Sequence, residues 1–243
     1  MRAAGKIIHE IFKELESVIK PGISTKDIDI LVEKRIREKK AKASFKNYAT
    51  SPGQSGFPGS SCISVNDEVI HGIPKRNRKV REGDIVSVDL GVFLNGYHAD
   101  AARTFAAGKI SANARKLIDV TRESFFAGIQ YAKEGFRVGD ISGAIQDFVE
   151  AQRFSVVKDF VGHGIGRSLH ESPSIPNFRE RGRGVRLKSG MTLAIEPMVN
   201  AGRAGVLLCE DDWTVITEDG KWSAHYENTV LITDGEPELL TLF

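Results

Sequence analysis

Apolar residues recur along the chain with two different periods. In MRAAGKIIHEIFKELESVIK, at 1–20, they return every three or four positions, which predicts an amphipathic helix. In EGDIVSVD, at 82–89, and SGMTLAIE, at 189–196, they form short runs that predict strands, each ending in an acid. We therefore expect an α+β fold in which helices cover one face of an antiparallel sheet.

The two halves of the chain repeat the same order of elements. KPGISTKDI, which begins at Lys20, is matched by KEGFRVGDI at Lys133, and each predicts a Gly-containing turn with an Asp near the start of a second helix. The strands at 82–89 and 189–196 also match, and HAD (98–100) parallels HYE (225–227). We expect a single domain over 1–243, built from pseudo-symmetric halves at about 1–107 and 108–243.

A tight hairpin brings two of the acids together. Asn95-Gly96 is typical of a two-residue turn with positive φ at both positions. That turn places Asp100 opposite Gly91, which lies two residues from Asp89 and points to the same side of the sheet. Asp89 and Asp100 are therefore expected as diagonal neighbours, roughly 7–8 Å apart at Cα.

The second half is expected to supply two more acids. Glu227 lies in a strand that we expect to pair through the Asp219-Gly220 turn, and symmetry would bring it and Glu196 to the aspartates. Like charges at about 4 Å repel by some 4 kcal/mol at an effective dielectric near 20. Protons would relieve that repulsion, and so would two divalent cations, which we favour. The imidazole of His163 would then be a fifth ligand, a donor set that suits manganese, iron, cobalt or zinc.

Composition excludes several classes of protein. The chain has 41% hydrophobic and 27% charged residues and a net charge of +2, as in ordinary globular proteins. Its two cysteines form no disulfide framework. Charges interrupt the apolar positions at 1–20, so this segment is not a signal peptide. No apolar run reaches the roughly 20 residues of a membrane span. We expect a cytoplasmic monomer without membrane contact.

Basic residues gather in three stretches. These are EKRIREKKAKASFK (33–46), KRNRKVR (75–81) and RERGRGVRLK (179–188). Solvated surface is the preferred interpretation, with weak, salt-sensitive contact to a ribosome as the alternative. Because few aromatic residues interleave with these charges, we expect no specific nucleic-acid recognition.

One loop combines three glycines with two histidines. VGHGIGRSLHESP, at 161–173, does not match G-x-G-x-x-G, and no acid follows it at dinucleotide-binding spacing. We therefore do not expect this loop to bind the phosphates of a dinucleotide. The chain also contains neither G-x-S-x-G nor H-E-x-x-H, so neither nucleophilic hydrolysis by a serine nor a mononuclear zincin site is supported.

Taken together, the motifs resemble those of type I methionine aminopeptidases. The resemblance spans nearly the whole chain and keeps the order of the motifs, which are NDEVIHGIP (66–74), VDLG (88–91), HADAARTF (98–105), GHGIGR (162–167), AIEP (194–197) and HYENTV (225–230). It implies the pita-bread (creatinase/aminopeptidase) fold. It also implies a catalytic domain that removes the initiator methionine from nascent proteins whose second residue is small.

The resemblance also implies roles for individual residues. Two divalent ions would be bound, with Asp100 and Glu227 bridging them, by Asp89, Asp100, His163, Glu196 and Glu227. Glu196 would relay a proton, His170 would stabilise charge on the tetrahedral oxygen, and His71 would hydrogen-bond the substrate near the scissile nitrogen.

Further residues are implied for binding. The methionine pocket would be formed by Phe57, Cys62 and Trp213, although Cys62 is equally well explained as a small buried apolar residue. A monovalent cation would lie at Asn66, Glu68 and Ser223.

Two departures from the family pattern affect the pocket. Leu169 stands where the family often has an aromatic residue, and the segment 47–62 differs from the usual aromatic-rich approach to the cysteine.

Two other functions remain open. An Xaa-Pro aminopeptidase or prolidase would share the ligands but prefer proline, and HGIP with Trp213 favours methionine instead. A non-catalytic binding protein of this fold would be expected to lose ligands, and all five are present.

Overall fold

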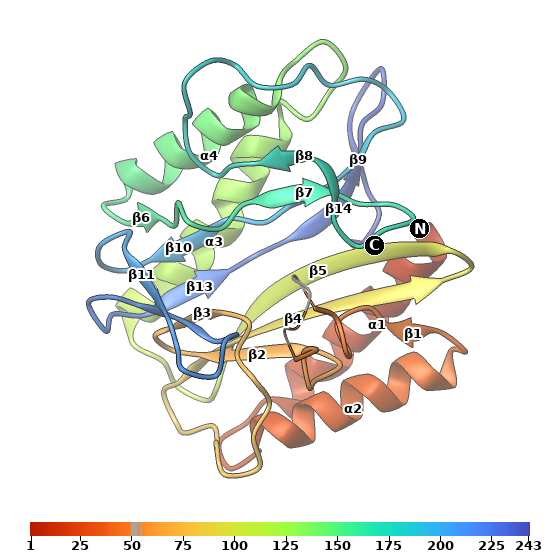
Figure 1. Cartoon of the computed structure of the whole chain (residues 1–243). Coiled ribbons are helices and arrows are strands. Elements are labelled where there is room, and N and C mark those ends of the chain that lie inside the picture. Colours follow the sequence, from red (N-terminus) through yellow and green to blue (C-terminus); the bar gives the residue numbers. More distant parts are fainter. Residues whose placement is uncertain (50–52, 54) are drawn as a thin grey trace.

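Two pairs of helices cover one side of a curved layer of antiparallel strands (Figure 1), which pair within the described residues as sheets of four, three, three and five strands. The structure is a computed structural model, and it describes residues 1–49, 53 and 55–243. The helices are α1 (Arg2–Val18), α2 (Thr25–Glu38), α3 (Ala112–Ile129) and α4 (Val138–Ala151). The strands are β1 (Lys42–Ala43), β2 (Cys62–Val65), β3 (Glu68–Ile70), β4 (Ile85–Leu94), β5 (Tyr97–Ala106), β6 (Ser155–Val156), β7 (Gly162–Gly164), β8 (Glu171–Ile175), β9 (Thr192–Ile195), β10 (Met198–Asn200), β11 (Val206–Leu208), β12 (Val215–Thr217), β13 (Ser223–His225), β14 (Asn228–Leu231) and β15 (Glu238–Leu239).

Each helix pair packs its apolar side on its own part of the sheet. In α1, Ile8, Ile11, Phe12 and Leu15 are buried at helical spacing, as the sequence predicts. They join residues of α2, β2, β4 and β5 in one core, whereas α3 and α4 form a second core with β9, β13 and β14. The other side of the sheet is thereby left for a site.

The two helix pairs begin alike. In the turn before α2, Gly22 has φ 98°, and in the turn before α4, Gly135 has φ 90°. The Asp27 carboxylate accepts the backbone N–H of Ser24, and the Asp140 carboxylate accepts that of the residue three positions before it. These matching details support the prediction of two related halves, and the division of the chain at about residue 107 stays a prediction.

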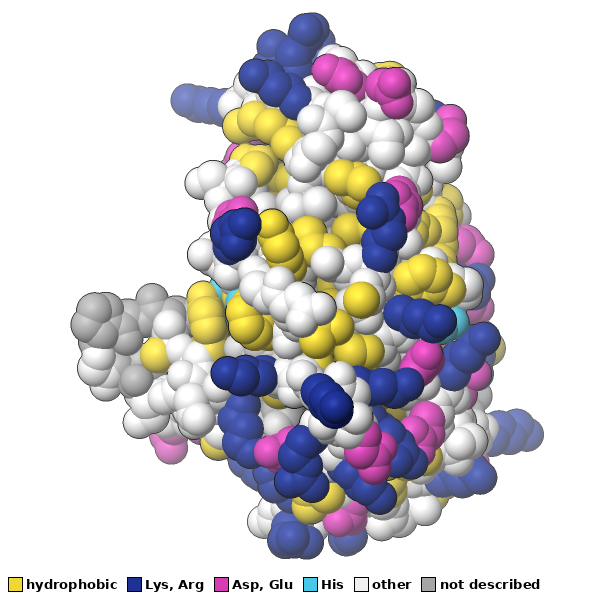
Figure 2. Space-filling model, turned by 90° about the vertical axis from the view of Figure 1, so that its right-hand side faces the viewer, with side chains coloured by type: hydrophobic (Ala, Val, Ile, Leu, Met, Phe, Trp, Pro, Cys, Tyr) yellow, Lys and Arg dark blue, Asp and Glu magenta, His cyan; other side chains and the backbone are white. Residues whose placement is uncertain are grey.

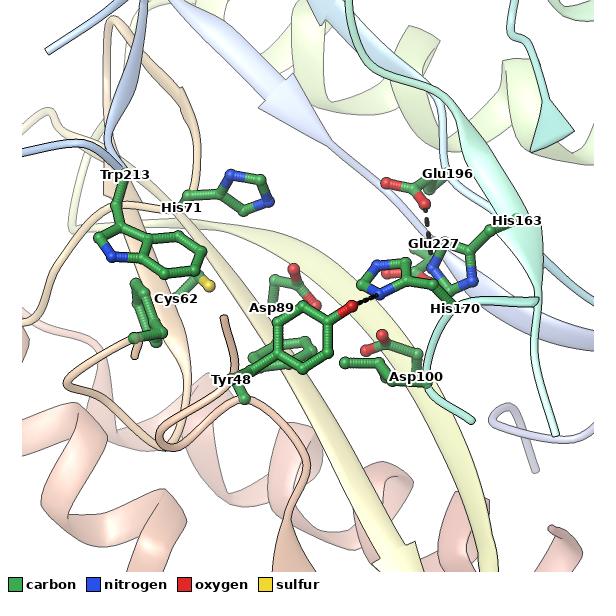
Figure 3. Close-up of a pocket in the computed structure, with 13 residues that line it drawn as sticks. Tyr48, Cys62, His71, Asp89, Asp100, His163, His170, Glu196, Trp213 and Glu227 are labelled. Atoms are coloured by element: carbon green, nitrogen blue, oxygen red, sulfur yellow. Dashed lines mark hydrogen bonds and ion pairs between the residues drawn. The ribbon is translucent and has the colours of Figure 1, made fainter. Parts of the chain in front are cut away.

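The hairpin of β4 and β5 has the predicted register. Leu94 pairs with Tyr97 and Gly91 pairs with Asp100, without a bulge along the ladder. The Asn95-Gly96 turn therefore determines which side of the sheet Asp89 and Asp100 face. Both carboxyl groups point into one cavity (Figure 3).

The expected pairing through the Asp219-Gly220 turn is wrong. β13 pairs with β10, β14 pairs with β9, and β12 pairs with β11 and β3. The turn is present, since Gly220 N donates to Thr217 O, but the chain then leaves for a different sheet. Glu227 lies in the break between β13 and β14 rather than inside one continuous strand.

Hydrogen bonds across a seam join the two halves of the sheet. Asp100 N donates to the Thr229 hydroxyl at 2.9 Å, and that hydroxyl donates to Asp100 O at 2.8 Å. Glu227 N donates to Ala102 O at 3.0 Å. The guanidinium of Arg103 lies over the ring of Tyr226, 4.2 Å from its centre, and donates to Glu227 O. β5 and β14 are thus held side by side where their acids emerge.

Many charges on the surface are paired. In the basic stretch at 33–46, Arg35 pairs with Glu14, Lys39 with Glu10 and Lys46 with Glu33. Figure 2 shows basic and acidic side chains interspersed on one side of the molecule, around a band of apolar ones. No helix within the described residues is long and apolar enough to cross a membrane.

Replacing Gly5 by Ala should destabilise the fold. A Cβ at Gly5 would lie 1.7 Å from Leu240 O, so α1 would have to move away from the segment that pairs with Thr229. We expect Gly5→Ala to lower the free energy of unfolding by about 2 kcal/mol or more, measured by urea denaturation. Lys6→Ala, an exposed change in the same helix, is the control and should cost about 0.5 kcal/mol at most. Equal stability of the two variants would contradict the contact.

Candidate metal centre and substrate pocket

Four acids and a histidine from both halves converge on one cavity (Figure 3). β4 carries Asp89, β5 carries Asp100 and β7 carries His163. Glu196 follows β9 and Glu227 precedes β14, and because Ile195 pairs with Asn228, the two glutamates lie opposite each other. The structure therefore brings together all five residues that the sequence singles out.

The donor atoms of this cluster fit metal cations. One ligand atom each of Asp100, His163 and Glu227 lie within 4.8 Å of one another. Asp89 Oδ1, Asp100 Oδ1 and Glu227 Oε1 are buried and have no hydrogen-bond partner among the described residues. Buried acceptors without partners are costly, and cations satisfy such oxygens directly. Oxygen ligands with one imidazole suit divalent ions of the first transition row.

Without a bound cation, these four carboxyl groups do not readily stay ionised. Burial, followed by the charge of Asp100, raises the pKa of Asp89, Glu196 and Glu227 well above the usual range. The pKa of Asp100 itself is raised to about 7, mainly by burial. The charge of Asp100 thus acts on each of the other three acids, so the four carboxyl groups form one electrostatically linked cluster.

His163 presents one particular nitrogen to the acids. Its Nδ1 lies 2.8 Å from Gly164 O, and because a carbonyl only accepts, Nδ1 carries the proton. Nε2 lies 3.6 Å from Glu196 Oε1 with a free lone pair. Burial lowers the pKa of His163 to about 4, which keeps the ring neutral as a metal ligand requires.

The glycines beside His163 allow close packing of the loop. A Cβ at Gly162 would lie 2.3 Å from Ala194 O, and one at Gly164 would lie 2.3 Å from Ser172 O. The strands on either side of β7 therefore approach its backbone closely, which seats His163 between them.

An apolar pocket adjoins the acids. Phe57 and Trp213 meet edge to face with centroids 5.3 Å apart, and Cys62 pairs in the ladder with Asp89. Leu169 is buried in the same apolar cluster, so it forms part of the wall in place of an aromatic residue. The cavity holds about 100 Å³, which is room for a side chain rather than for one water molecule.

Both substrate-contact candidates line the same cavity. His71 has a positive φ of 58° and lies 6.2 Å from Trp213 between ring centroids. Burial lowers its pKa to about 4. The ring of His170 lies 4.2 Å from that of His163 between centroids, and its Nδ1 lies 2.6 Å from the hydroxyl of Tyr48.

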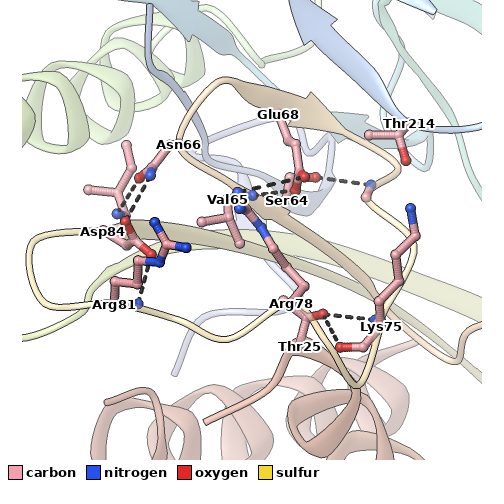
Figure 4. Close-up of polar contacts among 12 residues, drawn as sticks. Thr25, Ser64, Val65, Asn66, Glu68, Lys75, Arg78, Arg81, Asp84 and Thr214 are labelled. Atoms are coloured by element: carbon pink, nitrogen blue, oxygen red, sulfur yellow. Dashed lines mark hydrogen bonds and ion pairs between the residues drawn. The ribbon is translucent and has the colours of Figure 1, made fainter. Parts of the chain in front are cut away.

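The three residues expected at a monovalent cation lie outside this cavity. Ser223 N donates to Asn66 O at 2.8 Å, and the Glu68 carboxylate accepts Val65 N at 2.8 Å. The Asn66 side chain is held by Asp84, 2.8 Å from its Nδ2 (Figure 4). Asn66 and Ser223 are therefore neighbours, and their binding of a cation stays a prediction.

Sequence reasoning missed three residues at the site. Phe45 and Tyr48 line the cavity from a segment that has no recognisable motif. His225 is buried, and its Nε2 lies 3.8 Å from Glu196 Oε2. A histidine two positions before the acid occurs in both HAD and HYE, and that echo was the available signal. In the divergent segment 47–62, residues 50–52 and 54 lie outside the described residues.

Comparisons with known proteins define the class. The chain matches metallopeptidase family M24 over residues 1–234, so it belongs to that family, whose members use divalent metal ions. The resemblance in the motifs is confirmed by a methionine aminopeptidase of Clostridium acetobutylicum, 54% identical over 100% of this chain and 94% of the relative. Methionine aminopeptidase 1 of Bacillus subtilis is 50% identical over 99% of this chain and 94% of its own length.

Solved structures confirm the pita-bread fold. A methionine aminopeptidase of Thermotoga maritima superposes with a TM-score of 0.95 at 44% identity, covering 100% of this chain and 95% of the other. A prolidase of Pyrococcus furiosus gives a TM-score of 0.76 at 21% identity, covering 100% of this chain and 62% of that one. The second likeness is one of fold alone.

Neutralising Asp100 should stabilise the metal-free protein. Because burial raises the pKa of Asp100 to about 7, its charge opposes folding as the pH rises from about 4 to 7 and above. We expect Asp100→Asn to raise Tm at pH 8 in chelator by several degrees, since about 1 kcal/mol shifts Tm by ~2–4 °C at this size. Added Mn²⁺ should raise Tm in the unaltered protein but not in the variant.

The control for this measurement is Asp159→Asn, a change at an exposed acid. It should leave both Tm and its response to Mn²⁺ unchanged. A metal-free Asp100→Asn protein that melts below the unaltered protein would show that the carboxylate stabilises the fold by itself.

Proposed function

We propose that this chain hydrolyses the first peptide bond of proteins and peptides that begin with methionine, when the second residue is small. The observation that carries the proposal is an apolar cavity of side-chain size that opens directly onto a buried carboxylate cluster. The names of the relatives that match the whole chain support the same activity.

Two divalent cations would be held by Asp89, Asp100, His163, Glu196 and Glu227. One ligand atom each of Asp100, His163 and Glu227 lie within 4.8 Å of one another, which supports a shared site. When bound, such a pair of ions lowers the pKa of water and polarises a carbonyl oxygen. Manganese, iron, cobalt and zinc all fit the ligand types.

The protein side chains would handle protons and charge. The Glu196 carboxylate would accept a proton from the attacking water at Oε2, which lies 3.8 Å from His225 Nε2, and pass it to the leaving amine. His170 would donate from its ring to the carbonyl oxygen as negative charge develops there. His71, held neutral by burial, would hydrogen-bond the substrate backbone near the scissile nitrogen.

Methionine would be recognised by the apolar side of the cavity. Phe57 and Trp213 offer ring edges and faces to a thioether, and Cys62 adds a polarisable sulfur. Phe45 and Leu169 complete an apolar wall, which would favour an apolar side chain over a polar one.

Finer points belong to the same proposal. The enzyme would act on nascent chains as a cytoplasmic monomer, with weak ribosome contact through its basic stretches. A monovalent cation would be held near Asn66, Glu68 and Ser223, where Asn66 O accepts Ser223 N.

Removing metal should abolish the activity. In thorough chelator we expect no release of methionine from a Met-Gly-type peptide, and dialysis into Mn²⁺ or Co²⁺ should restore it, since the residues alone do not activate water. Released methionine is measured by chromatography, with Xaa-Pro peptides tested in parallel. Full activity in chelator would refute the metal role, and cleavage limited to Xaa-Pro peptides would reassign the substrate.

His170→Ala should separate chemistry from metal binding. We expect normal metal content and a kcat on Met-Gly-type peptides about 10²–10³-fold lower, because one donor to the developing oxyanion is lost. Steady-state kinetics and elemental analysis give the two readouts. His163→Ala is the comparison and should lose metal, and a metal-free His170→Ala protein would mean that the two histidines have exchanged roles.

A further inference from the structure

The site contains two adjacent imidazoles whose Nδ1 atoms have different partners. His163 and His170 lie 4.2 Å apart between ring centroids, at an interplanar angle of 57°. Each ring has one nitrogen, Nδ1, engaged by a neighbour, and Nε2 is then the nitrogen available for chemistry. The neighbours differ in what they can accept and donate.

The neighbour of His163 only accepts. Gly164 O lies 2.8 Å from Nδ1, so the proton of the neutral ring sits on Nδ1 and the lone pair on Nε2. This is the tautomer that ligates a metal.

The neighbour of His170 is able to donate. The hydroxyl of Tyr48 lies 2.6 Å from Nδ1, and this hydroxyl has no other hydrogen-bond partner among the described residues. Burial raises the pKa of Tyr48, so the phenol keeps its proton at neutral pH. A phenol that donates to Nδ1 leaves the ring proton on Nε2.

The position of Tyr48 is determined by its backbone. Tyr48 N donates to Phe45 O at 2.9 Å, Phe57 N donates to Tyr48 O at 2.7 Å, and Asn47 N donates to Phe57 O at 2.9 Å. A Cβ at Gly56 would lie 2.7 Å from the backbone of Asn47, so the backbone at Gly56 and the backbone at Asn47 approach closely. The backbone hydrogen bonds that join Asn47 and Tyr48 to Phe57 therefore hold both side chains in place, with the Tyr48 hydroxyl beside His170.

We infer that Tyr48 is a positioning residue that holds His170 as the Nε2–H tautomer, opposite to the tautomer in which Gly164 holds His163. One ring thereby offers a lone pair at Nε2 and the neighbouring ring offers a proton there. The two rings differ in the partner of Nδ1, which is a carbonyl for His163 and a hydroxyl for His170. This difference is enough to give two adjacent histidines different functions. The consequence for catalysis rests on the proposed aminopeptidase activity, whereas the tautomer itself does not.

The tautomer is measured by two-bond ¹H–¹⁵N correlation spectra of the zinc-loaded protein, with His170 assigned by comparison with His170→Ala. In the unaltered protein the ring proton of His170 should lie on Nε2 and that of His163 on Nδ1. Tyr48→Phe should shift His170 toward a mixture of tautomers and leave His163 unchanged. Tyr131→Phe, which removes an exposed hydroxyl elsewhere, is the control and should change neither ring.

Kinetics test whether Tyr48 acts through His170. Tyr48→Phe should lower kcat on a Met-Gly-type peptide about three- to tenfold, the effect of one neutral hydrogen bond, with little change in KM. In a His170→Ala background the same substitution should have no further effect, because the group it positions is gone.

Three results would overturn the inference. The spectra of the unaltered protein place the His170 proton on Nδ1, or Tyr48→Phe leaves the tautomer unchanged, or the kinetic loss persists in full without His170. If the protein cleaves no Met-Gly peptide at all, the proposed function fails, while the spectra still decide the role of Tyr48.

Discussion

Mutual repulsion among buried carboxylates is the constraint on which the site depends. Strands of both halves bring Asp89, Asp100, Glu196 and Glu227 into one cavity, where burial raises the pKa of all four acids and the charge of Asp100 raises that of the other three further. A fold that gathers four acids in this way is less stable without cations than one with amides at the same positions. The apolar cores under α1–α2 and α3–α4 and the hydrogen bonds of Thr229 oppose that repulsion and keep the seam closed.

The local parts of this arrangement were predictable from the sequence, and the distant parts were not. Asn95-Gly96 sets the register of β4 and β5, because a two-residue turn leaves only one pairing. The same reasoning failed at Asp219-Gly220, where the turn forms but β13 pairs with β10. A turn restricts the residues beside it, whereas the partner of a short strand is decided by packing across the whole sheet.

The same distinction explains which site residues were found. The acids and His163 lie in motifs that repeat or match a family, so sequence reasoning reached them. Tyr48 contacts His170 across 122 positions of chain, and no periodicity or spacing indicates that contact. His225 lies two positions before Glu227 in the sequence, yet its Nε2 approaches Glu196 Oε2. The position of Glu196 depends on the pairing of β9 with β14.

A dense cluster of similar groups needs a way to give each one a different task. Among the acids, position does this, because Glu196 Oε2 lies 3.8 Å from His225 Nε2, whereas the backbone of Asp100 is hydrogen-bonded to Thr229. Among the histidines, the partner of Nδ1 does it, since a carbonyl can only accept the Nδ1 proton, whereas a hydroxyl can donate its own proton to Nδ1. Substituting the ligands themselves would remove function without showing how it is divided. Substituting Gly164 is also uninformative, because its carbonyl belongs to the backbone and every substitution keeps it. The phenol of Tyr48 is the one side chain in this pair of contacts whose removal changes a tautomer and leaves both rings in place.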